Sequence, residues 1–134
     1  MGKGLTKRQQ QLKESFIKER GYWSEDLWEP VLKIDPDFFE AYVNFSSAPW
    51  KKGALPPKTK ELIYIAVDAA TTHLYEPGLR VHVANALRYG ATQEEIMEVL
   101  ELVSALGIHT LVMGVPVLLE ELKKAGKRTR APRV

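Results

Sequence analysis

The hydrophobic positions of the chain recur at intervals of three and four residues, a spacing typical of amphipathic helices. Between residues 79 and 87 the apolar stripe follows the order i, i+3, i+4, i+7 and i+8, and it includes a histidine, His82. No segment alternates apolar and polar residues over a useful strand length. The pattern therefore predicts an all-α protein, a single-domain bundle of about six or seven helices.

Residues that start or stop helices divide this pattern into elements. Thr6 and Gly21 are predicted to bound the first helix. Thr92 and Glu95 form a capping box that opens a later helix. A stretch rich in Pro, Gly and Ser that contains Trp50 is predicted to be a loop. The helices expected from these signals cover 6–20, a short segment from 24, a segment from 36 up to a loop at 46–57, then 57–72, 79–90, 92–107 and 108–125.

The last predicted helix, 108–125, is apolar nearly all round, and Pro116 is expected to kink it near residues 112–114. A helix without a polar face must be covered in a water-soluble protein. In a domain this small we expect the cover to be another subunit, which predicts a homo-oligomer. The alternative is a central helix wrapped by the other helices of the same chain.

The composition narrows the chemistry that is open to this 134-residue chain. It contains no cysteine, which excludes disulfides, thiolate nucleophiles and cysteine-based zinc sites, and fits a cytoplasmic location. We find no secretory signal and no apolar run near the ~20 residues that span a bilayer, so no membrane partner is expected. Residues 123–134 form a basic tail without aromatic residues. We interpret it as a solubilising end, with no nucleic-acid partner.

Three histidines are the scarce groups with acid–base capacity. His82 lies on an apolar stripe, where a histidine is either a satisfied core residue or a buried proton carrier. His73 lies nine residues earlier, across a predicted break, so the chain lacks the HxxxH spacing that would place two metal ligands on one helical face. We therefore expect no metal and no cofactor. Glu61, in the first turn of the fourth predicted helix, is the acid of interest.

Two segments carry a resemblance to a known family. LPPKTKELIYIAVDAA (55–70) and HVANALRYGATQEEIMEVLELVSALGIHTLVMGVP (82–116) resemble the carboxymuconolactone decarboxylase family, which includes the alkylhydroperoxidase D-like proteins. The resemblance divides the chain into N-terminal helices (1–54), a family-like core (55–122) and the basic tail (123–134). It implies an all-α fold that assembles into trimers or hexamers, with sites near subunit contacts.

The resemblance also assigns positions within the family pattern. Glu61 and His82 match the glutamate and histidine of the peroxidase branch, whose two cysteine positions fall on Tyr75 and Gly78. Without thiols, the disulfide cycle of that branch is impossible here. The chain also holds two extra residues between the glutamate and the histidine, which puts their pairing in question. An Arg-x-His like that of the decarboxylase branch is present at Arg80 and His82.

The activity implied by the resemblance is cofactor-free decarboxylation of an unsaturated lactone acid or a related ring-cleavage product. In that reaction His82 would donate a proton to carbon, and Glu61 would orient the imidazole. Arg80 would bind a substrate carboxylate, while Trp50 and Tyr75 would line an apolar pocket that excludes water. The alternative is a non-catalytic oligomeric protein that binds a small carboxylic acid in the same pocket.

Overall fold

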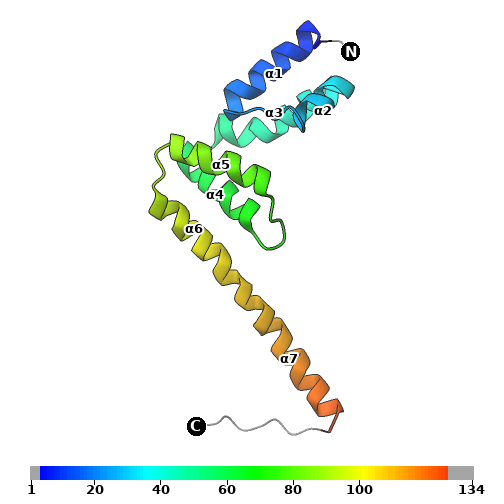
Figure 1. Ribbon diagram of the computed structural model, residues 1–134, viewed down its shortest axis with the longest axis vertical. Coiled ribbons are helices and arrows are strands. Elements are labelled where there is room, and N and C mark those ends of the chain that lie inside the picture. Colours follow the sequence, from blue (N-terminus) through cyan, green and yellow to red (C-terminus); the bar gives the residue numbers. More distant parts are fainter. Residues whose placement is uncertain (1–3, 127–134) are drawn as a thin grey trace.

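The computed structural model describes residues 4–126, and these residues contain helices and turns but no strand. This confirms the predicted all-α fold. Most of the basic tail, residues 127–134, lies outside the described residues. The helices shown in Figure 1 are α1 (Lys7–Arg20), α2 (Trp28–Ile34), α3 (Pro36–Lys52), α4 (Pro57–Ala69), α5 (Glu76–Arg88), α6 (Gln93–Ala105), the 3₁₀ turn η1 (Leu106–Ile108) and α7 (His109–Lys124).

The first three helices pack around an aromatic core. Phe16 of α1 and Phe39 of α3 are almost fully buried, and the ring of Trp23 meets Phe16 edge-on at a centroid distance of 5.5 Å. Lys13 of α1 pairs with Glu29 of α2 and so joins the two helices. The hydrogen bonds that Lys33 and Lys13 donate lower the pKa of the Glu29 carboxyl to about 2. The predicted bounds of α1 are confirmed by the Thr6 capping box and by Gly21, whose φ of 77° places it in the left-handed region.

Two expectations for this part of the chain are wrong. The second helix begins at Trp28 rather than at Ser24, because the Ser24 hydroxyl accepts from the Leu27 N–H and closes a turn ahead of the helix. The predicted loop at 46–57 is reduced to 53–56, since α3 continues through Pro49 to Lys52. Arg20 donates a hydrogen bond of 3.0 Å to the Ser46 carbonyl, close to the position where proline leaves a carbonyl without its helical donor.

Helices α4 and α5 pack closely along their length and carry a second core. The predicted break at 73–78 is too long, because α5 already begins at Glu76, with Pro77 in its first turn. The Tyr75 N–H donates to the Asp68 carbonyl at 2.8 Å and closes the short connection. The predicted Thr92–Glu95 capping box is confirmed at the start of α6.

The C-terminal helices form one continuous helix, Gln93–Lys124, that projects away from the rest of the molecule (Figure 1). Gly107 does not end α6 as expected, and α7 runs without interruption past Pro116. Leu106–Ile108 and α7, together called the terminal arm, have no buried residue. The alternative of a central helix wrapped by the other helices of one chain is therefore wrong.

The composition of this continuous helix also corrects the expectation that the chain has no apolar segment long enough to span a bilayer. By length and apolar content alone, the helix is sufficient to cross a membrane, although its sequence is interrupted by charged residues towards each end. The core helix of a water-soluble assembly passes the same test, so the pattern has more than one structural origin.

Candidate active site

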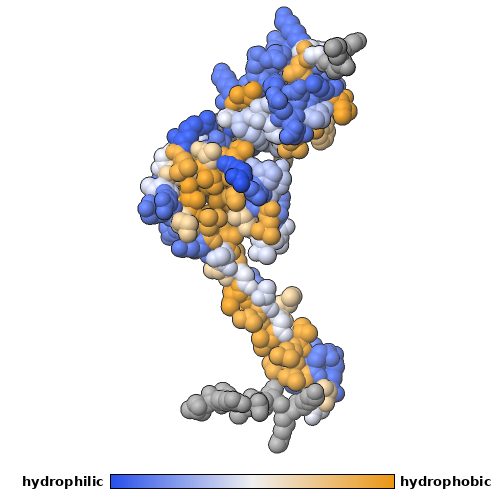
Figure 2. All heavy atoms as spheres, in the orientation of Figure 1, coloured by the Kyte–Doolittle hydropathy of each residue, from blue (hydrophilic) through white to orange (hydrophobic). Residues whose placement is uncertain are grey.

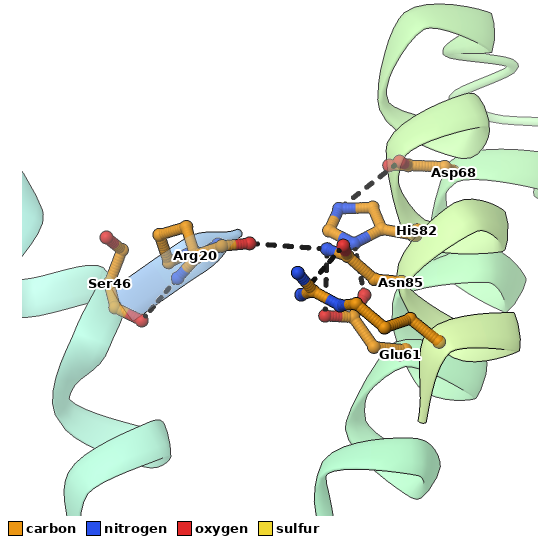
Figure 3. A network of polar contacts seen from close by, with 7 residues as sticks. Arg20, Ser46, Glu61, Asp68, His82 and Asn85 are labelled. Atoms are coloured by element: carbon orange, nitrogen blue, oxygen red, sulfur yellow. Dashed lines mark hydrogen bonds and ion pairs between the residues drawn. The ribbon is translucent and has the colours of Figure 1, made fainter. Parts of the chain in front are cut away.

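A short hydrogen bond between α4 and α5 forms the centre of the site (Figure 3). The Oε2 atom of Glu61 lies 2.6 Å from Nδ1 of His82, and the glutamate is only 2% exposed. The two extra residues between them are accommodated in the α4–α5 connection and leave this pairing intact. Because Nδ1–H donates to Glu61, Nε2 is the ring nitrogen that remains for a substrate.

Asn85, one turn after His82 on α5, completes the surroundings of the carboxylate. Its Nδ2 group lies 3.3 Å from Glu61 Oε1 and 3.3 Å from the backbone carbonyl of Arg20. Its side-chain carbonyl accepts from Arg88 at 3.1 Å. Both oxygens of Glu61 therefore have a hydrogen-bond partner, as buried polar groups usually do. The contact with Arg20 also ties the end of α1 to the site.

Tyr64 of α4 holds the plane of the imidazole. Its ring stacks on His82 with centroids 4.5 Å apart and an interplanar angle of 21°. Trp50 stacks on Tyr64 at 6.3 Å, and it lines a separate hollow of about 360 Å³ together with Lys60 and Leu55. Trp50 is thus part of a helix rather than of a loop, and it supports Tyr64 from outside the pocket that His82 faces.

That pocket, called the site pocket, has a volume of about 640 Å³ and lies between the segment 20–28, α3 and the α4–α5 pair. His82 is 12% exposed and forms part of its wall. The volume suits a small organic ligand. The charged residues in the wall are Arg20, Glu25, Asp26 and Asp68. The aromatic residues in the wall are Tyr22, Trp23, Trp28, Tyr42, Tyr64 and Tyr75.

Two of the aromatic residues bring hydrogen-bond donors to the site pocket. Burial raises the pKa of the Tyr22 hydroxyl above its ordinary value, which keeps it a neutral donor. The indole N–H of Trp23 is buried and has no acceptor among the described residues. A buried donor without an acceptor is rare.

Asp68 is a member of the site that sequence reasoning missed. Its Oδ2 atom lies 3.8 Å from Nε2 of His82, and its Oδ1 atom lies 3.5 Å from Nε2 of His73. The residue is 8% exposed, and Oδ2 has no hydrogen-bond donor among the described residues. A signal was available, because Asp68 follows Glu61 by seven residues and so lies on the same face of α4.

The other predicted residues are divided between the pocket and solvent. Tyr75 lines the site pocket, as expected. Arg80 lies outside it, with a side chain that is 77% exposed and paired with Glu76 on the same helix. Gly78 lies in the first turn of α5, where a Cβ atom would collide with Asp68 Oδ2 and the Tyr75 ring, so a side chain here would require one of them to shift.

No group of three or more His, Asp or Glu side chains within residues 4–126 is arranged to hold a metal ion. The chemistry that these groups provide is therefore that of a buried carboxylate–imidazole pair beside an aromatic pocket. Together with the all-helical fold, this pair is what the resemblance to the alkylhydroperoxidase D-like proteins implies, without their thiols.

The family follows from the comparison with known sequences. The family model of the carboxymuconolactone decarboxylase family matches residues 36–108, and the chain belongs to this family. The match includes the whole of α4 and α5, and with them Glu61, Asp68 and His82. It begins earlier than the resemblance at residue 55 and ends where the terminal helix α7 begins.

A solved structure is similar to nearly the whole chain. It is that of a proposed gamma-carboxymuconolactone decarboxylase subunit from Burkholderia xenovorans LB400, with 54% sequence identity and a TM-score of 0.83 over 93% of this chain. This chain covers only 50% of the length of that protein. Among curated proteins, no match to the chain was found.

Proposed function

We propose that the protein catalyses the cofactor-free decarboxylation of an unsaturated lactone acid or a related ring-cleavage product. The observation that carries the proposal is the imidazole of His82, which is held by Glu61 at 2.6 Å and faces a largely aromatic pocket. The family membership and the solved relative support the class of substrate.

The proposed reaction needs one proton donor and an electron acceptor within the substrate. The bond between the substrate carbon and its carboxylate breaks, carbon dioxide leaves, and the electron pair passes into the conjugated lactone carbonyl. The resulting enolate carbon then takes the Nε2 proton of the His82 imidazolium. Glu61 remains ionised and stabilises the positive ring before the transfer, in the way a carboxylate orients a catalytic histidine.

The walls of the site pocket fit the other parts of such a substrate. The Arg20 guanidinium in the wall is a donor suited to a carboxylate. The aromatic walls exclude water from the reacting carbon, which strengthens the interaction of the imidazolium with a developing negative charge. In this proposal Arg20, rather than Arg80, binds the substrate carboxylate.

We also propose that the protein is a homo-oligomer in which a second copy covers the terminal arm. The similar solved structure is that of a subunit. Its match covers 93% of this chain and therefore includes part of α7, which begins at residue 109. The arm exposes a continuous set of apolar side chains (Figure 2): Leu106, Ile108, Leu111, Val112, Met113, Val115, Val117, Leu118 and Leu119.

The exposed area is of the size that a subunit interface buries. The chain exposes 10,278 Å², whereas a compact monomer of 15.2 kDa would expose roughly 7,100 Å². Obligate interfaces bury roughly 2,000–5,000 Å² in total. Trimer and hexamer both satisfy this requirement.

The direct test of the proposed activity is His82→Ala, assayed by loss of carbon dioxide from γ-carboxymuconolactone. We expect kcat to fall ~100- to 10,000-fold, the range that a positioned general acid contributes. Glu76→Gln, an exposed change on the same helix, is the control and is expected to keep normal turnover. Normal turnover in a folded His82→Ala protein would remove His82 from the reaction. Thermal stabilisation by the lactone without any turnover in the wild type would favour the binding protein instead.

A further inference from the structure

The site contains a second carboxylate that the proposed reaction has not yet used. Each decarboxylation consumes one proton, so His82 must be reprotonated before the next turnover. Glu61 is a poor route for that proton, since it is 2% exposed and its contacts are His82 and the buried side chain of Asn85. The open side of the His82 ring, at Nε2, faces Asp68.

Asp68 connects the buried histidine to a histidine at the surface. One carboxylate oxygen faces Nε2 of His82 at 3.8 Å, and the other faces Nε2 of His73 at 3.5 Å (Figure 3 shows the first contact). The side chain of His73 is 51% exposed, whereas that of Asp68 is 11% exposed. The three groups therefore form a path from solvent, through a buried carboxylate, to the proposed proton donor.

The position of Asp68 is constrained by its neighbours rather than by a hydrogen bond to Oδ2. Gly78 of α5 lies against this oxygen, where any side chain would collide with it. Oδ2 is also buried without a donor in the part of the chain that the structure describes. An unpaired buried carboxylate oxygen is costly, so its position next to an imidazole needs an explanation other than stability.

We propose that His73 and Asp68 form a proton relay that recharges His82 after each turnover. This inference rests on the proposed function for its purpose, although the relay itself is a property of the resting protein. The other charged residues in the wall of the site pocket are Arg20, Glu25 and Asp26. None of them forms an ion pair with His73, Asp68 or His82 among the residues described.

The steps balance as follows. After His82 has given its Nε2 proton to the substrate carbon, the ring is neutral and keeps its Nδ1 proton on the Glu61 side. The His73 imidazolium then gives a proton to Oδ1 of the Asp68 carboxylate, and the carboxyl that results passes this proton to Nε2 of His82. His73 finally takes a proton from water or from a buffer acid. The net reaction is the loss of carbon dioxide and the gain of one proton by the product.

The distance between Asp68 and His82 indicates when the transfer takes place. At 3.8 Å the two atoms are too far apart for a direct hydrogen bond. The substrate carbon that takes the proton lies beside Nε2, so we place reprotonation after product departure. Rotation of the Asp68 carboxyl, which carries the protonated oxygen from the His73 side to Nε2, then completes the path.

The first experiment needs no substrate. The exchange of the His82 ring N–H protons with solvent is measured by NMR in the ¹⁵N-labelled full chain, with the signals assigned by their loss in His82→Gln. We expect His73→Gln and Asp68→Asn each to slow the exchange of the Nε2 proton by about 100-fold, the low end of what a positioned proton-transfer group contributes. Glu76→Gln is the matched control and is expected to leave the exchange unchanged. Unchanged exchange in both relay variants would overturn the proposal.

The second experiment uses turnover of γ-carboxymuconolactone. We expect His73→Ala to lower kcat about 100-fold and KM in proportion, with kcat/KM unchanged, because reprotonation follows the irreversible loss of carbon dioxide. Imidazole added to the buffer should restore kcat in His73→Ala, where it replaces an exposed group. It should not restore kcat in Asp68→Asn, whose position is closed to solutes. A lower kcat in His73→Ala that imidazole leaves unchanged would assign His73 a structural role and contradict the relay.

The two experiments separate the relay from the activity. If the wild type does not decarboxylate the lactone, the proposed function fails, and slow exchange in the relay variants would still support the path. If the wild type is active and exchange is the same in all variants, the relay fails while the activity stands. Should Asp68→Asn not fold, His73→Gln, at a half-exposed turn position, still gives the decisive comparison.

Discussion

The helical body (residues 7–105) and the terminal arm (residues 106–124) both carry many apolar side chains, but only the body buries them within the chain. In the body, each helix buries an apolar face against a neighbour, and Phe16, Phe39 and Ile65 are almost completely shielded. In the arm, apolar residues cover most of the circumference and none is buried within the chain. The body therefore has its own core, whereas we propose that the arm is covered by a second copy of the chain.

This difference also separates the two kinds of claim about function. The Glu61–His82 pair, Asp68 and the site pocket all belong to the body, so the proposed chemistry can be examined in a single chain. The state of assembly depends on the arm. A variant that changes only the assembly or only the body would support the independence of the two regions. A variant that changes both would contradict it.

The largest effect is expected from charging the arm. Leu111 and Leu118 are more than half exposed and lie seven residues apart on one face of α7. We predict that the double variant Leu111→Lys, Leu118→Lys converts the oligomer to monomers, because two charges would have to be buried at the interface. The mass in solution, measured by light scattering after size exclusion, checks the prediction.

The control for this variant is Glu120→Lys. It changes the net charge by the same amount at an exposed polar position of the same helix, so it should leave the assembly intact. All three tryptophans lie in the body, at Trp23, Trp28 and Trp50, so their fluorescence reports on the body alone. It should be unchanged in both variants. A monomeric wild type, or an intact oligomer in the double Lys variant, would show that the arm is not the interface.

A smaller effect, confined to the body, is expected from Phe16→Ala. Phe16 contacts the rings of Trp23, Trp28 and Phe39, and its loss leaves a cavity in the core. We predict that the free energy of unfolding falls by about 3–5 kcal/mol, as for other buried aromatic truncations. Urea unfolding followed by tryptophan fluorescence measures this change. The folded fraction should keep the wild-type assembly, and a change in its oligomeric state would mean that body and arm are coupled.

Much of the fold could be predicted because the helix signals are local. Thr6, Gly21 and Thr92 act on backbone groups within three or four residues, and each lies where it was expected. The boundaries that failed depend on partners far away in sequence. The extension of α3 through Pro49 brings Trp50 onto Tyr64, and Arg20 of α1 bonds to the carbonyl of Ser46. Neither contact can be read from the residues around Pro49.

The site was predictable in its centre and not in its wall. The family pattern singled out Glu61 and His82, and the structure brings them together. Asp68 was within reach of the same helical periodicity, but His73 joins it through a turn whose shape the sequence left open. Nearly half of the pocket wall comes from the segment 20–28, which carries no family signal and meets α4 and α5 only in the folded chain.

The central claim is that Glu61 and His82 act as one proton-donating unit. A double-mutant cycle on kcat for γ-carboxymuconolactone, with Glu61→Gln, His82→Ala and the two combined, tests it most directly. Since Glu61 acts only through the imidazole, we predict that the double variant is no slower than His82→Ala alone. Losses that multiply across the two substitutions would show that the residues act independently, and would contradict the account.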